Sequence, residues 1–415
     1  MHLKFKWITD ILTLDVLVIG AGPAGSTTAK KIAERGFQVF VLDKNSLNRE
    51  KACAGAVTNR VIEHFKIPEK VFTRKCQGIF LCGPKNNTIL LGHNPKIRFT
   101  MRSIFDKTLC EIAIDKGAEF IEKSLVTEPL FKNKKIIGVK TKIDGKTKTI
   151  NAKLVIAADG TPSTIAKKLD LYSNKLNAIG FSYQYQMKLS NEKIEQRIGS
   201  NAENYFGSQW IPSGYLWIFP KNDIVTVGCV TKLEVVQQRR INLKQNLDHF
   251  IKKHPIASPK LEDAKVVKCQ AQLIGYPGVL KNNVADGCLI VGDASGTVSL
   301  WTSEGIWYSM MSGEAAGLSA AELLENDDVS ASNIRMKYFR NLDQRVIDDL
   351  RFAPKLVKFV DSDIKQQRII AAIIKDQWWA NLLESLMAGS CTYKDALKQI
   401  RMRPDKVIKA GILYR

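Results

Sequence analysis

The sequence lacks the features of a zinc site, a membrane span and a secreted protein. Its eight cysteines include no CxxC pair, and Cys76 and Cys82 have no histidine nearby, which argues against a zinc site. No stretch reaches the run of about 18 apolar residues that a membrane span needs. The apolar run after MHLKFKWITD is interrupted by Asp10 and Asp15 and does not resemble a signal peptide. We therefore expect a reducing, cytoplasmic compartment.

Acidic residues are scarce relative to basic ones. The chain has 62 Lys and Arg against 41 Asp and Glu, a formal net charge of +21. A basic surface attracts polyanions, but these lysines are scattered through turns such as KNKK and KTKTI, and no RNA- or DNA-binding motif is present. We expect no nucleic-acid partner. An anionic membrane surface and a lysine-rich proteome both stay open as explanations.

A glycine-rich turn lies between an apolar strand, predicted over residues 15–19, and a helix predicted from Pro23 to about Arg35. The turn has the GxGxxG spacing, supplied by Gly20, Gly22 and Gly25. The first glycine permits the tight turn, the second lets a pyrophosphate approach the backbone, and the third lets helix and strand pack closely. The block therefore predicts a dinucleotide site at the helix N-terminus.

A second predicted strand, residues 38–42, ends in Asp43. This is close to the spacing at which an acidic residue accepts hydrogen bonds from an adenosine ribose. An acid at this position favours an adenosine without a 2′-phosphate, because a phosphate would be repelled. Asp43 therefore extends the predicted dinucleotide site beyond the glycine-rich turn.

Two later blocks have the same order of strand, turn and helix. In the first, residues 154–158 form an apolar strand before Asp159-Gly160, and a helix is predicted to start at Ser163. In the second, residues 288–291 form a strand that ends in Gly292-Asp293, and a helix is predicted from near Ser303 to Leu324. Together the three blocks predict an α/β fold of two lobes around a cleft, which suits a chain of 415 residues.

With these blocks the chain resembles the geranylgeranyl reductase family of flavoproteins, in the superfamily that includes para-hydroxybenzoate hydroxylase. KACAGAV (51–57) resembles their K-x-C-G-G segment, and SGYLWIFPK (213–221) matches their Y-x-W-x-F-P motif. EGIWYSMMSGEAAG (304–317) fits their EGI-x-x-A-x-x-SG pattern. The resemblance covers most of residues 15–325, and the rest of the chain matches only loosely.

The resemblance implies FAD as the resident cofactor. Asp293 would bind the ribitol hydroxyls, and backbone N–H groups at the following helix start would face the flavin edge where reduced flavin is negative. Arg102 lies in the R-x-x-F-D-x-x-L pattern of the superfamily. Besides Asp293, the implied cofactor contacts are Ala24, Asp43, Cys53, Ala54, Ala56, Arg102, the backbone of Val126, Gly305 and Ile306.

The chain also departs from the family pattern. Ala54 replaces the first glycine after Cys53, Ser303 replaces a glycine, and Trp301 stands where a proline is usual. Trp301 would place a large ring near the flavin. These departures bear on the shape of the substrate cavity more than on the cofactor.

The resemblance implies a reductase that saturates isolated double bonds of a geranylgeranyl chain, on a lipid or a prenyl diphosphate, by hydride transfer from reduced flavin. Only one dinucleotide fingerprint is present, so NAD(P)H or another electron donor would bind transiently. An apolar tunnel for the prenyl-lipid substrate would be lined by Tyr215, Trp217 and Phe219. Cys53 is a candidate proton donor; a buried, inert thiol is the alternative.

Two other functions stay open. A flavin-dependent monooxygenase or halogenase would share the cofactor blocks, although W-x-F-P matches the halogenase W-x-W-x-I-P motif only partly. A basic, flavin-stabilised protein that binds membranes or nucleic acid would show salt-sensitive polyanion binding without turnover.

The motifs also predict the domain layout. A Rossmann-like FAD-binding domain would comprise residues 12–58, 98–165 and 265–325. A substrate domain, built on an antiparallel β-sheet, would comprise 59–97 and 166–264, because segments such as FSYQYQMKL and IVTVGCV alternate as strands do. Residues 326–415 would form C-terminal helices.

One C-terminal segment has the pattern of a helix that lies on a membrane surface. On a single helix over residues 368–389, one face would carry Ile370, Ile374, Trp378 and Leu382. Tandem tryptophans with flanking Lys and Arg suit the headgroup region of a bilayer. Such a face can also pack against the domain, so peripheral membrane contact is one of two interpretations.

Overall fold

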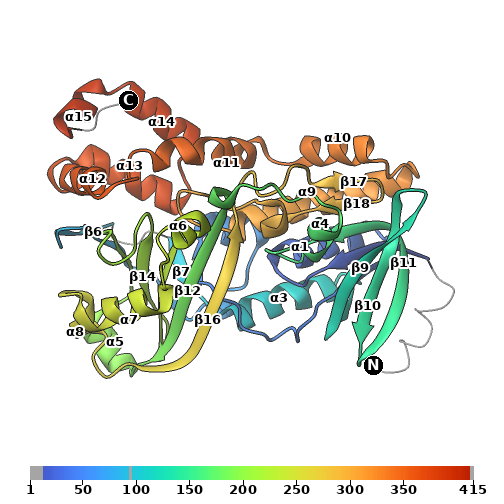
Figure 1. Cartoon of the computed structure of the whole chain (residues 1–415), viewed down its shortest axis with the longest axis horizontal. Helices are drawn as coiled ribbons and strands as arrows, with labels where there is room; N and C mark the ends of the chain where they lie inside the picture. Colours follow the sequence, from blue (N-terminus) through green and yellow to red (C-terminus); the bar gives the residue numbers. More distant parts are fainter. Residues whose placement is uncertain (1–12, 93–95, 412–415) are drawn as a thin grey trace.

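Two large β-sheets organise the chain (Figure 1). The computed structural model describes residues 13–92 and 96–411. The first sheet contains β1 (Thr13–Ile19), β2 (Val39–Leu42), β8 (Glu119–Ile121), β9 (Ser124–Lys132), β10 (Lys135–Ile143), β11 (Lys146–Ala157), β17 (Val284–Ala285) and β18 (Cys288–Ile290). Its centre is parallel, in the order β18-β11-β1-β2-β8, and β9 and β10 add an antiparallel extension to β11. The three predicted nucleotide-binding blocks therefore meet in one sheet.

Strand β1 is apolar from Val16 to Ile19 because both faces of this part are covered. Val16 and Val18 belong to the core under the helices, whereas Leu17 and Ile19 belong to the core on the opposite face. This is the pattern of a parallel strand buried on both sides. The helices over the first core are α1 (Pro23–Ala33), α3 (Arg102–Ile114) and α9 (Ile306–Glu325).

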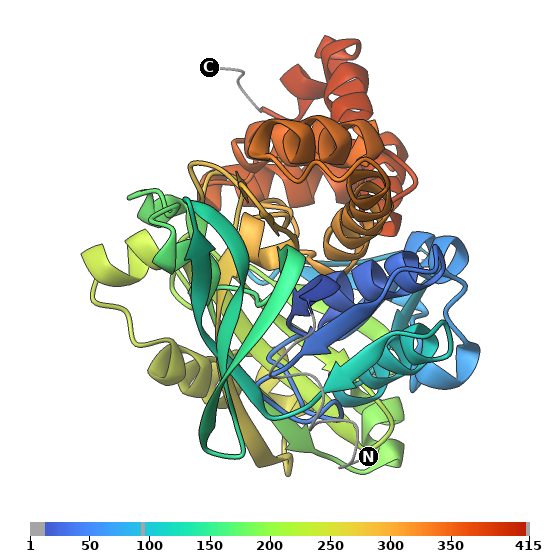
Figure 2. The ribbon, with the colours of Figure 1, turned by 90° about the vertical axis from the view of Figure 1, so that its right-hand side faces the viewer.

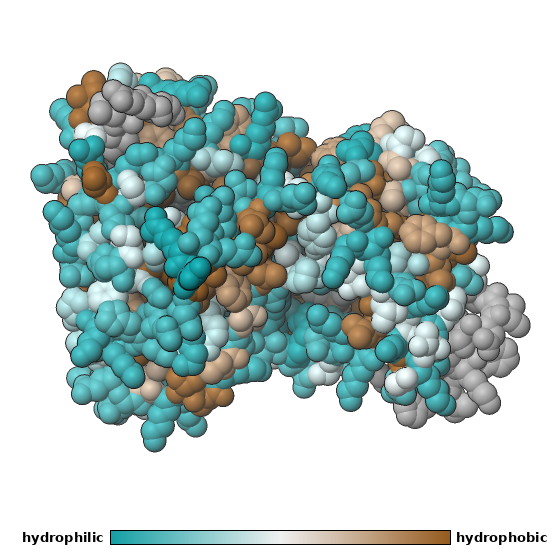
Figure 3. All heavy atoms as spheres, viewed as in Figure 1, coloured by the Kyte–Doolittle hydropathy of each residue, from teal (hydrophilic) through white to brown (hydrophobic). Residues whose placement is uncertain are grey.

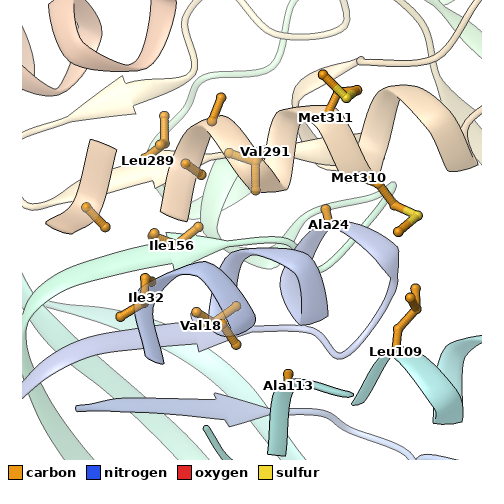
Figure 4. Packing of buried hydrophobic residues seen from close by; sticks show 14 of the residues in the cluster. Val18, Ala24, Ile32, Leu109, Ala113, Ile156, Leu289, Val291, Met310 and Met311 are labelled. Carbon is orange, nitrogen blue, oxygen red and sulfur yellow. The ribbon is translucent and has the colours of Figure 1, made fainter. Parts of the chain in front are cut away.

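Helices α1 and α9 pack closely against each other (Figure 4). A Cβ atom at Gly313 would lie 2.3 Å from the carbonyl oxygen of Ala24. The Thr28 hydroxyl donates hydrogen bonds to the carbonyls of Ala24 and Gly313, at 2.8 and 3.0 Å. The start of α1 is thereby fixed to α9, which brings the first and third blocks together.

The second sheet has the strand order β16-β12-β15-β14-β13-β5-β6. Its members are β5 (Gly78–Cys82), β6 (Thr88–Leu91), β12 (Ile179–Lys188), β13 (Asn201–Tyr205), β14 (Tyr215–Pro220), β15 (Ile224–Lys232) and β16 (Lys265–Gly275). Neighbours are antiparallel except β13 and β5, which run parallel. A small sheet of β3 (Ala56–Thr58), β4 (Arg74–Lys75) and β7 (Ile97–Phe99) completes the strands of the described residues.

The predicted boundary at residue 265 differs from the sheet pairing. Strand β16, which the sequence assigned to the FAD-binding domain, pairs with β12 from Ile179 opposite Gly275 to Lys188 opposite Lys265. Its polar, alternating sequence was not recognised as an edge strand of the second sheet. Residues 265–275 therefore belong with the substrate-side strands, and the layout of the domains otherwise stays a prediction.

The remaining helices of the described residues either precede α9 in the chain or follow it. The former are α2 (Asn59–Phe65), α4 (Thr164–Lys168), α5 (Asn191–Arg197), α6 (Leu233–Gln238), α7 (Leu243–Lys253) and α8 (Ala257–Lys260). The latter are α10 (Ala331–Asn341), α11 (Gln344–Val357), α12 (Asp363–Lys375), α13 (Gln377–Ala388), α14 (Tyr393–Arg401) and α15 (Pro404–Lys409). Figure 2 shows these later helices, in orange and red, gathered at one side of the molecule.

The prediction of a single helix over residues 368–389 is wrong. Helix α12 ends at Lys375, and Asp376 caps α13 by accepting a hydrogen bond from the Trp378 amide at 3.0 Å. Ile370 and Leu382 are buried, but Ile374 is 48% exposed. The break at Asp376 divides the expected apolar face between two helices.

Within the described residues no helix is long and apolar enough to cross a bilayer. The face in Figure 3 is mostly hydrophilic, with apolar side chains gathered near the middle of the view.

Candidate functional site

A cavity lies between the glycine-rich turn, the loop before β3 and one face of the second sheet. Its volume is about 1470 Å³, including the part open to solvent. The lining includes the predicted cofactor residues Gly22, Ala24, Cys53, Ala54, Ala56, Arg102, Asp293, Gly305 and Ile306. It also includes the predicted substrate residues Tyr215, Trp217 and Phe219. The fold therefore brings the two predicted sets together, while the lining does not include Gly20, Gly25, Asp43 or Val126.

The three glycines of the turn have different surroundings. A Cβ at Gly20, where φ is +98°, would lie 2.4 Å from the Ala158 carbonyl oxygen, and a Cβ at Gly25 would lie 1.8 Å from the Gly20 oxygen. These two positions allow the backbone to pack closely. A Cβ at Gly22 would meet only the Arg49 guanidinium, at 3.9 Å. Open space in front of Gly22, at the N-terminus of α1, fits a diphosphate.

Asp43 holds the glycine-rich turn in place through hydrogen bonds. Its carboxylate accepts hydrogen bonds from the amides of Ala21 and Asn45, both at 2.8 Å. Its backbone oxygen accepts from the amide of Ser124, at the start of β9, at 2.7 Å. Val126 lies two residues further along β9, opposite Thr141 of β10. The predicted contact of its backbone with the adenosine therefore stays a prediction.

Arg49 is a residue that the sequence analysis missed. Its guanidinium lies 2.8 Å from the Asp106 carboxylate and 3.7 Å from that of Asp43. It also faces the open space beside Gly22, where a cation would stabilise phosphate. Its position in the loop after β2 follows no motif, so only the presence of a basic residue near the predicted ribose acid could have indicated it.

Arg102 is held rigidly at the start of α3. Its guanidinium donates two hydrogen bonds of 2.8 Å to the two carboxylate oxygens of Asp106, which is fully buried. Burial acts to raise the pKa of Asp106, but the charges of Arg102 and Arg49 lower it below its ordinary value. The Cys53 thiol lies close enough to interact electrostatically with Arg102. The Arg102 guanidinium is thereby held in one position at the cavity lining.

Asp293 lies in a short 3₁₀ turn, Gly292–Ser295, before α9. Its carboxylate accepts hydrogen bonds from the Ser309 hydroxyl at 3.0 Å and from the Lys51 ammonium at 3.3 Å. Burial acts to raise the pKa of Asp293, yet the charge of Lys51 and the Ser309 hydrogen bond lower it overall. The residue is therefore an ionised acceptor at the cavity wall, and its contact with the ribitol stays a prediction.

Helix α9 begins later than the sequence predicted. Its first residue is Ile306, with Gly305 before it, whereas Ser303 has a left-handed backbone with φ of +55°. A glycine, the residue usual here in the family, adopts this conformation without strain. The later start places Gly305 and Ile306 at the cavity. The first amides of α9 lack helical partners and suit a negative flavin edge.

An aromatic wall, formed by Tyr215, Trp217 and Phe219 of β14, covers the other side of the cavity. Alternate residues of a strand share a face, which explains their common orientation. The Tyr215 hydroxyl donates to the Thr302 carbonyl at 2.8 Å. A Cβ at Gly228, on the adjacent strand, would lie 2.3 Å from the Trp217 ring. The indole therefore occupies the space that this glycine leaves.

A second cavity adjoins the first. It shares Asn204, Tyr215, Thr302 and Met387 with the first, and α12 contributes Ile369, Ile370 and Ile373. Trp301, which was expected beside the flavin, lines this second cavity and is absent from the lining of the first. The contribution of α12 and α13 was not predicted, because this part of the chain carries no recognisable motif.

Comparisons with known proteins agree with this geometry. A family model described as an FAD binding domain matches residues 13–328. Digeranylgeranylglycerophospholipid reductase 2 of Methanosphaera stadtmanae is 32% identical over 342 residues, 78% of this chain and 82% of that protein. The chain belongs to the geranylgeranyl reductase family of FAD-dependent oxidoreductases. The predicted cofactor, FAD, is confirmed.

Other relatives also match this reductase over most of its length. The digeranylgeranylglycerophospholipid reductase of Methanococcus aeolicus is 30% identical over 364 residues, 84% of this chain and 88% of that protein. A geranylgeranyl bacteriochlorophyll reductase-like structure from Thermoplasma acidophilum has a TM-score of 0.79 and 24% identity, covering 94% of this chain and 98% of that one. A flavin-dependent brominase has a TM-score of 0.75 and 17% identity, covering 94% and 100%. The last two similarities show a shared fold.

Proposed function

We propose that this enzyme saturates isolated double bonds of a geranylgeranyl chain carried by a lipid or by diphosphate. The observation that carries the proposal is the shared cavity, in which the aromatic wall faces the residues predicted to contact FAD. An elongated apolar substrate suits this wall and the adjoining cavity lined by isoleucines of α12. The names of the curated relatives support the same class of substrate.

Each group of residues has a role in this proposal. When bound and reduced, FAD supplies a hydride. The Gly22 backbone would hold its diphosphate and Asp293 its ribitol, which fixes the ring against the cavity. The aromatic wall would position the alkene and exclude water. Cys53, which lines the same cavity, would donate a proton to the second carbon of the double bond.

The electron donor and the membrane are further parts of the proposal. We infer that NAD(P)H or another carrier reduces the flavin in a transient encounter, because the chain has a single dinucleotide fingerprint. We also infer peripheral contact with an anionic membrane, since the chain is strongly basic and a prenyl lipid resides in a bilayer. Flotation with anionic vesicles that weakens at high salt would support this contact, and equal flotation with neutral vesicles would contradict it.

Anaerobic single turnover tests the reaction. FAD-loaded protein is reduced with dithionite and mixed with a geranylgeranyl lipid. We expect reoxidation of the flavin and a product heavier by one H₂ for each saturated bond. In a monooxygenase or halogenase, by contrast, the reduced flavin would be reoxidised only when oxygen is present. No reoxidation by any prenyl compound would overturn the proposal.

Lipid analysis in a heterologous host identifies the substrate. The chain is expressed in a host that makes unsaturated geranylgeranyl lipids, and the lipids are compared by mass spectrometry with those from a Gly22→Val control. Loss of double bonds in one lipid class would name the substrate. Unchanged lipids in every class would count against a lipid-borne chain and leave prenyl diphosphate to be tested in the purified system.

A further inference from the structure

Lys221 is a buried lysine with no ion-pair partner in the described parts of the chain. It directly follows β14 and is 2% exposed. Its ammonium donates hydrogen bonds to the Ala54 carbonyl at 2.8 Å and to the Thr226 hydroxyl at 2.7 Å. Both acceptors are neutral. A buried charge without a counter-ion is costly, which suggests that this lysine serves the site above it.

The loop that carries Cys53 packs against Lys221. Gly55 has φ of +78°, and a Cβ there would lie 2.2 Å from the Thr100 carbonyl oxygen and 3.3 Å from the Lys221 side chain. The Gly55 amide in turn donates to the Cys53 sulfur at 3.4 Å. The loop is therefore packed tightly on Lys221, and the lysine bonds to the carbonyl of the residue next to Cys53.

The charged groups around Lys221 favour an interaction with the thiol. Burial lowers the pKa of Lys221 to about 8, and the nearby Cys53 and Glu50 oppose this decrease. Glu50 is already bound by Ser103 and by Gln186. Arg74 donates to the Lys221 backbone carbonyl at 2.9 Å, and its own charge is paired with Glu195. Arg102, like Lys221, interacts electrostatically with Cys53, so two cationic groups act on the thiol.

We propose that Lys221 is a positioning residue: its ammonium holds the Cys53 loop against the second sheet and stabilises the Cys53 thiolate. This inference rests on the proposed role of Cys53 as proton donor. In that step the carbon–carbon π bond breaks, one carbon receives the hydride from reduced flavin, and the other receives the Cys53 proton. The S–H electron pair stays on sulfur as a thiolate, and the flavin ends oxidised. The ammonium of Lys221 stabilises that negative charge until water restores the proton.

The test is the rate at which iodoacetamide alkylates Cys53 in the FAD-loaded enzyme, read on the Cys53 peptide by mass spectrometry. Lys221→Gln removes the charge but keeps a hydrogen-bond donor, and Lys221→Met removes both. At neutral pH we expect both variants to react about fivefold or more slowly, because the thiolate loses a nearby cation. The control Thr226→Val keeps the charge and should react at the wild-type rate.

Two outcomes with the variants would overturn the proposal. A slow Lys221→Met with a normal Lys221→Gln would show that the lysine acts only through its hydrogen bonds, and equal rates in all variants would show no role at all. A measurement on the wild type needs no variant to fold: at neutral pH, Cys53 should be alkylated faster than Cys391, a half-buried thiol whose pKa is raised by burial. Equal rates for the two thiols would overturn the proposal. No prenyl substrate is present in these experiments, so failure of the proposed reductase activity would not affect them.

Discussion

The two sides of the cavity are built in different ways. The cofactor side uses backbone atoms and small residues at the glycine-rich turn, where a side chain would fill the space that a phosphate needs. The substrate side uses large side chains, the aromatic wall of β14, supported by strands and helices from distant parts of the chain. The first side therefore tolerates no added atoms, whereas the second should tolerate changes that alter the reaction and leave the cofactor bound.

The largest effect is expected at Gly22. Gly22→Val places a branched side chain in the open space at the N-terminus of α1, where the diphosphate would lie. We expect purified protein without the yellow flavin spectrum. Far-ultraviolet circular dichroism serves as the control for folding. A folded variant with full flavin occupancy would contradict the assignment of the cofactor side.

A smaller effect on the same side is expected at Asp293. Asp293→Ala removes the carboxylate predicted to accept hydrogen bonds from the ribitol, and each such bond to a charged group contributes about 1.5–3 kcal/mol. Flavin affinity, measured by fluorescence titration, should fall about tenfold or more. Asp293→Asn keeps one acceptor oxygen, so its flavin affinity should lie between those of the wild type and Asp293→Ala. An unchanged dissociation constant for Asp293→Ala would mean that the turn is only structural.

On the substrate side, a substitution should slow the reaction and leave the flavin bound. Trp217→Ala removes the central ring of the aromatic wall, so we expect reoxidation by a geranylgeranyl substrate to slow about tenfold, with little change in flavin content. Trp210→Ala, which removes a buried indole that lines neither cavity, is the matched control. Equal reoxidation rates in wild type and Trp217→Ala would reject the wall as a substrate site.

The smallest effect concerns Asp159, behind the cofactor side. Burial raises the pKa of Asp159 from 3.8 to about 6. Between these values the folded protein binds more protons than the unfolded chain, so stability falls as pH rises through this window and stays reduced above it. Asp159→Asn keeps an oxygen for the Thr164 amide, which donates at 2.7 Å. In flavin-free protein we expect a gain in unfolding free energy at pH 7.5 and none at pH 4. An equal change at both values would exclude ionisation as the cause.

The sequence predicted the cofactor side better than the substrate side for a physical reason. The turn between β1 and α1 is set by nearest neighbours along the chain, so the glycine spacing was sufficient to predict it. The place of β16 depends on pairing with β12, far away in the sequence, and the break at Asp376 depends on one capping bond. Lys221 and Arg49 acquire their surroundings only when separate segments fold together.

The contact between Trp217 and Gly228 makes the substitutions allowed at one position depend on the residue at the other. The indole fills the space left by the missing side chain of Gly228. A change at either position therefore alters how well the residue at the other position packs. Homologues that keep the tryptophan should keep the glycine, and those that lose it are free to enlarge residue 228. A library meant to reshape the enzyme for shorter or longer chains should therefore vary the two positions as a pair.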